Sequence, residues 1–151
     1  MINQAKRQTA IAKHTMKGIR LAKGMSRNNL GYAGEMYAKQ QLERLGLNVL
    51  YTGKLGVGYD LLVNGVLKVE IKTALLNNEE RYQFSLRKDS TDVQKFADVR
   101  KADIVILQCV GNTGNVTSFV MPTIAVYNNK QVKITSDPSS YAGKFAKYRI
   151  A

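Results

Sequence analysis

The stretch YDLLVNGVLKVEIKT, residues 59–73, contains two apolar runs joined by a tight turn. Asn64-Gly65 between the runs is a strong signal for a β-hairpin. In the second run apolar and charged residues alternate, so Glu70 and Lys72 lie on one face of a strand, about 7 Å apart. This segment therefore predicts a hairpin whose second strand presents an acid and a base together.

A helix is expected before the hairpin, over residues 30–45, and Gly46 can end it in a left-handed conformation. Glu35 shares the helix face that points to the core. A carboxylate aimed inward must be paired, protonated or bound to a metal ion. The apolar residues of that face are Ala38, Leu42 and Leu45.

The rest of the chain predicts a single α/β domain over residues 28–151, with a mixed central sheet flanked by helices. Apolar periodicity and turn residues define its elements. Strands are expected over 47–51, 59–63, 66–73, 81–86, 103–110, 116–121 and 131–135. Helices are expected over 92–101 and 141–148, with a short helical turn from Pro122.

The charge indicates a polyanionic partner. Of 151 residues, 23 are Lys or Arg and 11 are Asp or Glu, a net charge of +12. Such an excess suits nucleic acid or an anionic membrane surface. Residues 1–27 hold seven basic residues and no acid, so we interpret them as a basic N-terminal arm. A solvated basic tail and an organelle transit peptide are the alternative interpretations. The candidate DNA-binding residues are Lys6, Arg7, Lys13, Lys17, Arg20, Lys23 and Arg27 in the arm, with Lys54 in a glycine-rich loop.

Two other classes of protein, membrane-spanning and disulfide-bonded proteins, are disfavoured. Apolar runs such as 104–107 fall far short of the roughly 20 residues of a membrane span, so a soluble protein without a membrane partner is expected. Cys109 is the single cysteine and makes no internal disulfide. A reducing, cytoplasmic location in contact with DNA is the simple inference.

Asp60, Glu70 and Lys72 supply the groups that phosphodiester hydrolysis needs. The reaction requires an activated water and neutralisation of charge on the phosphate and the leaving oxygen, and Mg²⁺ provides both. Mg²⁺ prefers hard oxygen ligands, such as carboxylates. A nearby lysine stabilises developing negative charge. The carbonyl of Ile71 lies between the acid and the lysine and is a further candidate ligand.

This arrangement resembles the PD-(D/E)xK nuclease superfamily. Asp60, ten residues, and Glu70-Ile71-Lys72, after a helix that carries Glu35, match its motif and element order over about residues 30–110. Small resolvase-like and intron-encoded homing endonucleases look most similar. The resemblance implies a restriction-endonuclease-like fold, metal binding by Asp60 and Glu70, catalysis by Lys72 and assistance by Glu35. Tyr59 stands where the motif has proline, a position that varies in the superfamily.

The expected function is Mg²⁺-dependent cleavage of double-stranded DNA, with Mn²⁺ as a substitute metal. A sequence-specific cutter of the homing or restriction type is slightly favoured. A Holliday-junction resolvase, a toxin nuclease domain and a non-catalytic nucleic-acid-binding module remain alternatives. Cutting both strands suggests a homodimer or a higher symmetric assembly.

The simplest hairpin conflicts with this chemistry. A two-residue turn would pair Val63 with Val66 and turn Asp60 and Glu70 to opposite faces of the sheet. A three-residue loop with Gly65 in a left-handed conformation would instead set Asp60 opposite Glu70, and a bulge near Asp60 would also turn its side chain. One of these irregularities is therefore expected.

Overall fold

The computed structural model describes residues 27–86 and 101–150. Most of the predicted arm, with Lys6, Arg7, Lys13, Lys17, Arg20 and Lys23, lies outside the described residues, as does most of the helix expected over 92–101. Arg27 opens the first described helix, α2 (Arg27–Arg44). Within the described ranges, no helix is long and apolar enough to cross a membrane.

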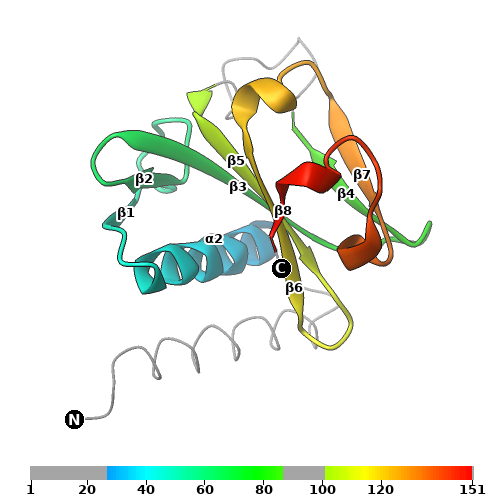
Figure 1. Ribbon diagram of the computed structural model, residues 1–151. Helices are drawn as coiled ribbons and strands as arrows, with labels where there is room; N and C mark the ends of the chain where they lie inside the picture. Colours follow the sequence, from blue (N-terminus) through cyan, green and yellow to red (C-terminus); the bar gives the residue numbers. More distant parts are fainter. Residues whose placement is uncertain (1–26, 87–100, 151) are drawn as a thin grey trace.

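The central sheet has six strands in the order β1-β2-β3-β5-β6-β8 (Figure 1). The pair β3–β5 is parallel and the other pairs are antiparallel, so the sheet is mixed and the predicted α/β class is confirmed. The strands are β1 (Val49–Tyr51), β2 (Leu61–Val63), β3 (Leu67–Leu75), β5 (Ile104–Val110), β6 (Val116–Pro122) and β8 (Arg149–Ile150). All but the last match predicted strands within about two residues.

The β2–β3 hairpin has the expected three-residue loop. Val63 pairs with Leu67, which leaves residues 64–66 in the loop. Gly65 has φ 73° and Asn64 has φ 51°, the left-handed region that glycine and asparagine tolerate best. This extra loop residue shifts the register by one and brings the end of β2 at Asp60 to the level of Glu70.

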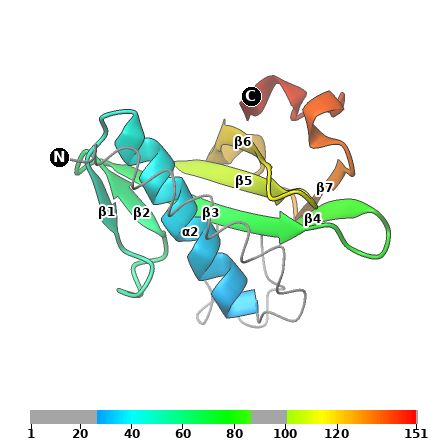
Figure 2. The same cartoon turned by 90° about the horizontal axis from the view of Figure 1, so that it is seen from below.

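Helix α2 crosses one face of the sheet (Figure 2). Ala38 and Leu42 pack against apolar residues of β2 and β3, as predicted. Gly46 follows the helix with φ 88°, and its N–H donates to Glu43 O. The prediction for Leu45 was wrong: the helix ends one residue earlier, and this side chain is 76% exposed.

The opposite face of the sheet is covered by a second, two-stranded sheet of β4 (Arg81–Ser85) and β7 (Gln131–Thr135). Its inner side chains join the larger core with Leu107, Phe119 and Met121. In the described part of the chain, a β-ribbon thus takes the place of the flanking helices expected on this side. Burial of Cys109 in the same core raises the pKa of its thiol to about 12.

The C-terminal helix predicted over 141–148 was wrong. Two short 3₁₀ turns, Pro138–Ser140 and Ala146–Tyr148, precede β8 instead. Gly143 disfavours a helix between them, and a Cβ there would overlap the Tyr141 hydroxyl. The short turn expected after Pro122 is present as Thr123–Ala125.

Candidate active site

The site forms where β2 and β3 separate. Asp60 directly precedes β2, and its N–H donates to the carbonyl of Val69 (2.9 Å), the residue already paired with Leu61. The ladder is therefore irregular at Asp60. Its Oδ2 accepts a hydrogen bond from the Ile71 N–H (2.8 Å), so the side chain caps the edge of β3 that β2 leaves open.

Thr52 fixes the backbone on the other side of Asp60. Its N–H donates to Asp60 O (2.8 Å), and its hydroxyl donates to Tyr59 O (2.8 Å). Thr52 is buried, so both bonds are shielded from water. The glycine-rich loop that carries Lys54 is consequently closed at its base, and Asp60 is held in one orientation.

Glu70 and Lys72 project from β3 at this fork, as the alternation predicted. Glu70 is 4% exposed, and Lys72 Nζ lies 3.3 Å from its Oε1. Within the described residues, Oε2 of Glu70 is buried without a hydrogen-bond partner. Burial, with repulsion from Asp60 second, raises the pKa of Glu70 to about 8 despite the opposing charge of Lys72.

Glu35 reaches the same point from α2. The Tyr51 hydroxyl donates to its Oε2 (2.8 Å), which ties the helix to the end of β1. Burial and then repulsion from Asp60 raise the pKa of Glu35 to about 7. Tyr51 was not predicted from the sequence, because no local pattern links two residues that lie 16 apart on different elements.

A second tyrosine and a lysine extend from Tyr51 toward the surface. The ring of Tyr32 lies edge-on to that of Tyr51, with centroids 5.9 Å apart. Lys54 Nζ lies 4.9 Å from the centroid of the Tyr32 ring. Lys54, the one candidate DNA-binding residue of the loop, has an exposed side chain and is connected to Glu35 through these two tyrosines.

A close contact between α2 and β3 sets the position of Glu35. The neighbouring residue, Gly34, lies so near the strand that a Cβ would overlap Thr73 Oγ1. Buried Gln108 donates from Nε2 to both Gly34 O and Thr73 Oγ1 (3.0 Å each). The helix is therefore hydrogen-bonded to the sheet one residue before its carboxylate, a contact that the sequence analysis also missed.

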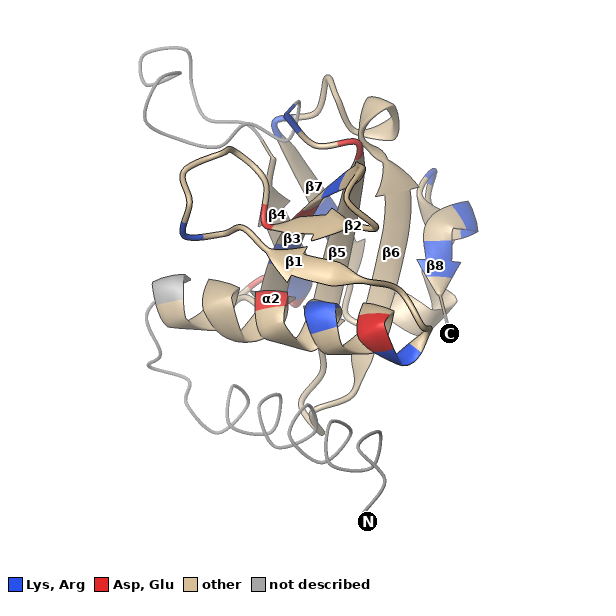
Figure 3. Cartoon of the chain, turned by 90° about the vertical axis from the view of Figure 1, so that its left-hand side faces the viewer, with Lys and Arg blue, Asp and Glu red and all other residues tan. Residues whose placement is uncertain are grey.

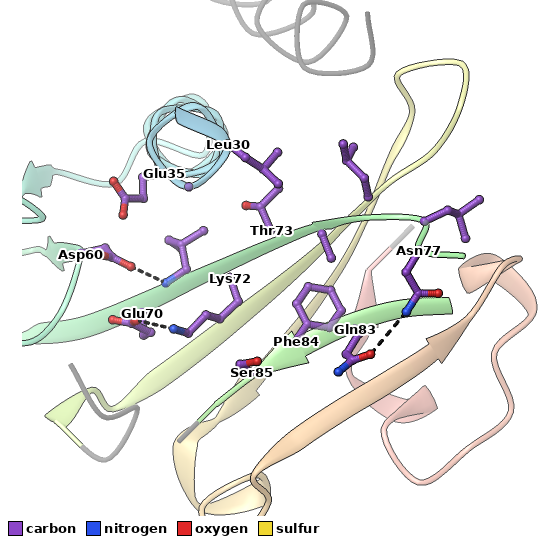
Figure 4. A pocket seen from close by; sticks show the side chains of 15 residues that line it. Leu30, Glu35, Asp60, Glu70, Lys72, Thr73, Asn77, Gln83, Phe84 and Ser85 are labelled. Carbon is purple, nitrogen blue, oxygen red and sulfur yellow. Dashed lines mark hydrogen bonds and ion pairs between the residues drawn. The ribbon is translucent and has the colours of Figure 1, made fainter. Parts of the chain in front are cut away.

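The three carboxylates and Lys72 border one cleft of about 600 Å³. Figure 4 shows the side chains of Glu35, Asp60, Glu70 and Lys72 around one end of it. Ile71 also lines the cleft. In a strand the N–H and C=O of one residue point to the same edge. Because the Ile71 N–H faces Asp60, its carbonyl faces the open edge of β3 as well.

The donor set suits a hard divalent cation. Three carboxylates that repel one another, with one buried oxygen left without a donor, favour a bound positive charge. Across the described ranges, no three acid, histidine or cysteine side chains already form a complete ligand set. Oε2 of Glu35 and Oδ2 of Asp60 accept hydrogen bonds from Tyr51 and Ile71, so each carboxylate is held through one oxygen and keeps its second oxygen for a cation.

Comparisons with known proteins identify a fold. No profile of a known protein family matches the sequence, and no curated protein sequence matches it. The structure, however, matches a solved one, that of the bacterial homing endonuclease I-Ssp6803I, with a TM-score of 0.65 and 17% sequence identity. The match covers 83% of this chain and 89% of that chain. At this identity the likeness is one of fold.

Proposed function

We propose that this protein is a metal-dependent endonuclease that hydrolyses phosphodiester bonds of double-stranded DNA, with a site of the PD-(D/E)xK type. One observation carries the proposal: three carboxylates and a lysine from separate segments meet at the end of one cleft. The fold likeness to a homing endonuclease supports DNA as the substrate and endonucleolytic cleavage as the reaction.

Mg²⁺, or Mn²⁺ in its place, would be held by the carboxylates of Asp60, Glu70 and Glu35, with the Ile71 carbonyl as a further ligand. When bound, such an ion neutralises charge on the phosphate and acidifies a water molecule. Burial, followed by repulsion between the carboxylates, raises the pKa values of Glu35 and Glu70, and this supports the assignment because a divalent cation would stabilise the charged carboxylates.

Lys72 is the residue that we assign to charge stabilisation. Its side chain lines the cleft and is partly buried, and Nζ lies 3.3 Å from Glu70 Oε1. From there the ammonium can donate hydrogen bonds to a phosphate oxygen or orient a water. Asp60 and Glu35 are held by the Ile71 N–H and the Tyr51 hydroxyl, so the site is organised before substrate arrives.

Within this class we propose a sequence-specific enzyme of the homing or restriction type, acting as a symmetric oligomer. A twofold pair of sites can cut both strands of a duplex. The native mass of the full-length protein, alone and on DNA, tests the assembly. Comparing cleavage of a four-way junction with cleavage of linear duplex distinguishes this role from that of a junction resolvase.

The test is cleavage of a randomised duplex library and of a four-way junction in Mg²⁺, Mn²⁺ or chelator. Duplex should be cut in either metal and spared in chelator. Asp60→Ala and Glu70→Ala should abolish cleavage while DNA binding persists, and Lys72→Ala should lower the rate about 10²- to 10³-fold.

A matched control is available on α2. Lys39 and Glu43 form an ion pair (2.9 Å) away from the cleft, so Glu43→Ala should leave the rate unchanged. Cleavage that continues at full rate in chelator would overturn the metal assignment. A full rate for Asp60→Ala or Glu70→Ala would remove that residue from the site.

A further inference from the structure

The ribbon of β4 and β7 has an outer face of a single chemical kind. Burial alternates along both strands, with alternate side chains packed into the core and the others exposed. Every outer side chain is able to donate or accept hydrogen bonds, and none is apolar. We call these residues the ribbon face: Arg81, Gln83 and Ser85 on β4, with Gln131, Lys133 and Thr135 on β7.

Two glutamines of the ribbon face, Gln83 at the centre of β4 and Gln131 at the start of β7, are held in place. Gln83 Nε2 donates to Gln131 Oε1 (2.7 Å), and Asn77 Nδ2 donates to Gln83 Oε1 (3.3 Å). Asn77 is itself fixed, since its Oδ1 accepts from the N–H groups of Glu79 and Arg81 (3.0 Å each). Side chains that are ordered beforehand lose less entropy when they bind a partner.

The ribbon face borders the same cleft as the candidate active site. Gln83 and Ser85 line it together with Glu70 and Lys72, and Figure 4 shows Gln83 and Asn77 toward its other end. Leu76 and Tyr82 form an isolated antiparallel β-bridge. In this register the next residue of β4, Gln83, lies level with Leu75 of β3. Leu75 is five residues from Glu70, about 17 Å along the strand. That length corresponds to about five base pairs at 3.4 Å each.

We propose that the ribbon face enters the major groove of double-stranded DNA and reads base edges there, with Gln83 and Gln131 as specificity-determining residues. The proposal rests on the proposed function. A two-stranded ribbon fits the major groove, about 12 Å wide, whereas the minor groove, about 6 Å wide, is too narrow. Glutamine amides form hydrogen bonds with N6 and N7 of adenine. The guanidinium of Arg81 is suited to hydrogen bonding with guanine.

The test is selection of bound duplexes from a randomised pool by the full-length chain, with Ca²⁺ in place of Mg²⁺ so that binding is measured apart from cleavage. Wild type should enrich a motif. Gln83→Ala should lose preference at positions about four to six base pairs from the bond that is cut in Mg²⁺, and Gln131→Ala should lose preference at neighbouring positions. Discrimination should fall roughly 5- to 100-fold for each base that is no longer read.

Two further variants sharpen the result. Gln41→Ala makes the same change on α2, in the groove beside β6, and should keep the wild-type motif. Gln83→Glu should move the preference toward cytosine, whose amino group a carboxylate accepts from. Because the ribbon-face side chains are exposed, the Gln83 and Gln131 variants should melt close to wild type.

The ribbon assignment is overturned if Gln83→Ala and Gln131→Ala both keep the wild-type motif, or if wild type enriches no motif. Cleavage measured in parallel in Mg²⁺ separates the two proposals. Cleavage without a motif contradicts the ribbon assignment alone. A ribbon-dependent motif without cleavage contradicts the proposed enzymatic function alone, and the absence of both contradicts both.

Discussion

At Glu70 a carboxylate is buried beside two others, with one lysine as its near partner. The pKa of about 8 lies above the ordinary value of 4.5. The folded metal-free protein therefore keeps a proton that the unfolded chain releases. Its free energy of unfolding falls as the pH rises from about 4.5 to about 8. Such a conflict between folding and ionisation is typical of functional sites.

Glu70→Gln should consequently stabilise the metal-free protein while abolishing cleavage. At pH 8.5 in chelator we expect the free energy of unfolding to increase by about 1–2 kcal/mol. Each kcal/mol should raise the melting temperature by about 2–4 °C. The gain should shrink toward pH 5, where the wild-type carboxyl is protonated. Thermal melting of both proteins at the two pH values measures it, with Glu43→Gln, a half-buried glutamate outside the cleft, as the control. Equal melting temperatures at pH 8.5 would contradict the account.

Tyr51→Phe should slow cleavage about tenfold without changing DNA affinity. The variant loses the hydroxyl that donates to Glu35 Oε2, a bond worth about 1.5–3 kcal/mol when the acceptor is charged. More Mg²⁺ should be needed for the half-maximal rate, which a purely structural role would not change. Tyr148→Phe, against the far core, is the control. An unchanged Mg²⁺ dependence would show that Tyr51 does not position Glu35.

Residue positions were predictable to different degrees. Strand alternation and the family resemblance indicated Asp60, Glu70 and Lys72, and the inward face of α2 indicated Glu35. Tyr51 and Gln108 act through contacts between elements distant in sequence, and one chain carries no local signal for such contacts. Arm residues such as Lys6 stay a prediction because they lie outside the described residues.

At the scale of elements, the β2–β3 loop illustrates how function constrained a local prediction. Asn-Gly alone favours a two-residue turn. The need to bring Asp60 to the level of Glu70 called for either one more loop residue or a bulge near Asp60, and the register confirms the longer loop. The C-terminal segment had no such constraint, and apolar spacing there was mistaken for a helix. Packing on the core and pairing with β6 determine its structure instead.

Gly34→Ala should destabilise the protein by about 1–3 kcal/mol and lower the cleavage rate. The new methyl group would overlap Thr73 Oγ1, so α2 and Glu35 must move away from β3. Gly31→Ala is the matched control on the same helix, because nothing lies within 4 Å of its Cβ position. It should stabilise by up to about 1 kcal/mol. Identical melting curves for the two variants would show that the Gly34 contact is unimportant.

At the scale of the whole molecule, the described residues account for less than half of the positive charge. They carry 13 basic and 8 acidic residues, a net +5 of the total +12. Figure 3 shows basic and acidic residues interspersed on the side of α2 and β1. Residues 1–26 hold six basic residues and no acid, so much of the attraction to a polyanion lies there.

Deleting residues 1–26 should weaken DNA binding and flatten its dependence on salt. The slope of log affinity against log salt should fall by about 0.9 for each phosphate that the arm neutralises. Affinity measured over a range of salt concentrations gives this slope for both proteins. A slope equal to that of the full chain would mean that the arm does not touch the DNA backbone.

The central claim is that the carboxylates at the β2–β3 fork form a divalent-metal site, and calorimetric titration with Mg²⁺ tests it without knowledge of the DNA target. At pH 7 we expect binding with release of protons, because Glu35 and Glu70 have pKa values of about 7 and 8. The apparent enthalpy should thus differ between buffers of different ionisation enthalpy, and Asp60→Asn and Glu70→Gln should bind at least tenfold more weakly. Wild-type affinity in both variants, or no Mg²⁺ binding by the wild-type chain, would contradict the account.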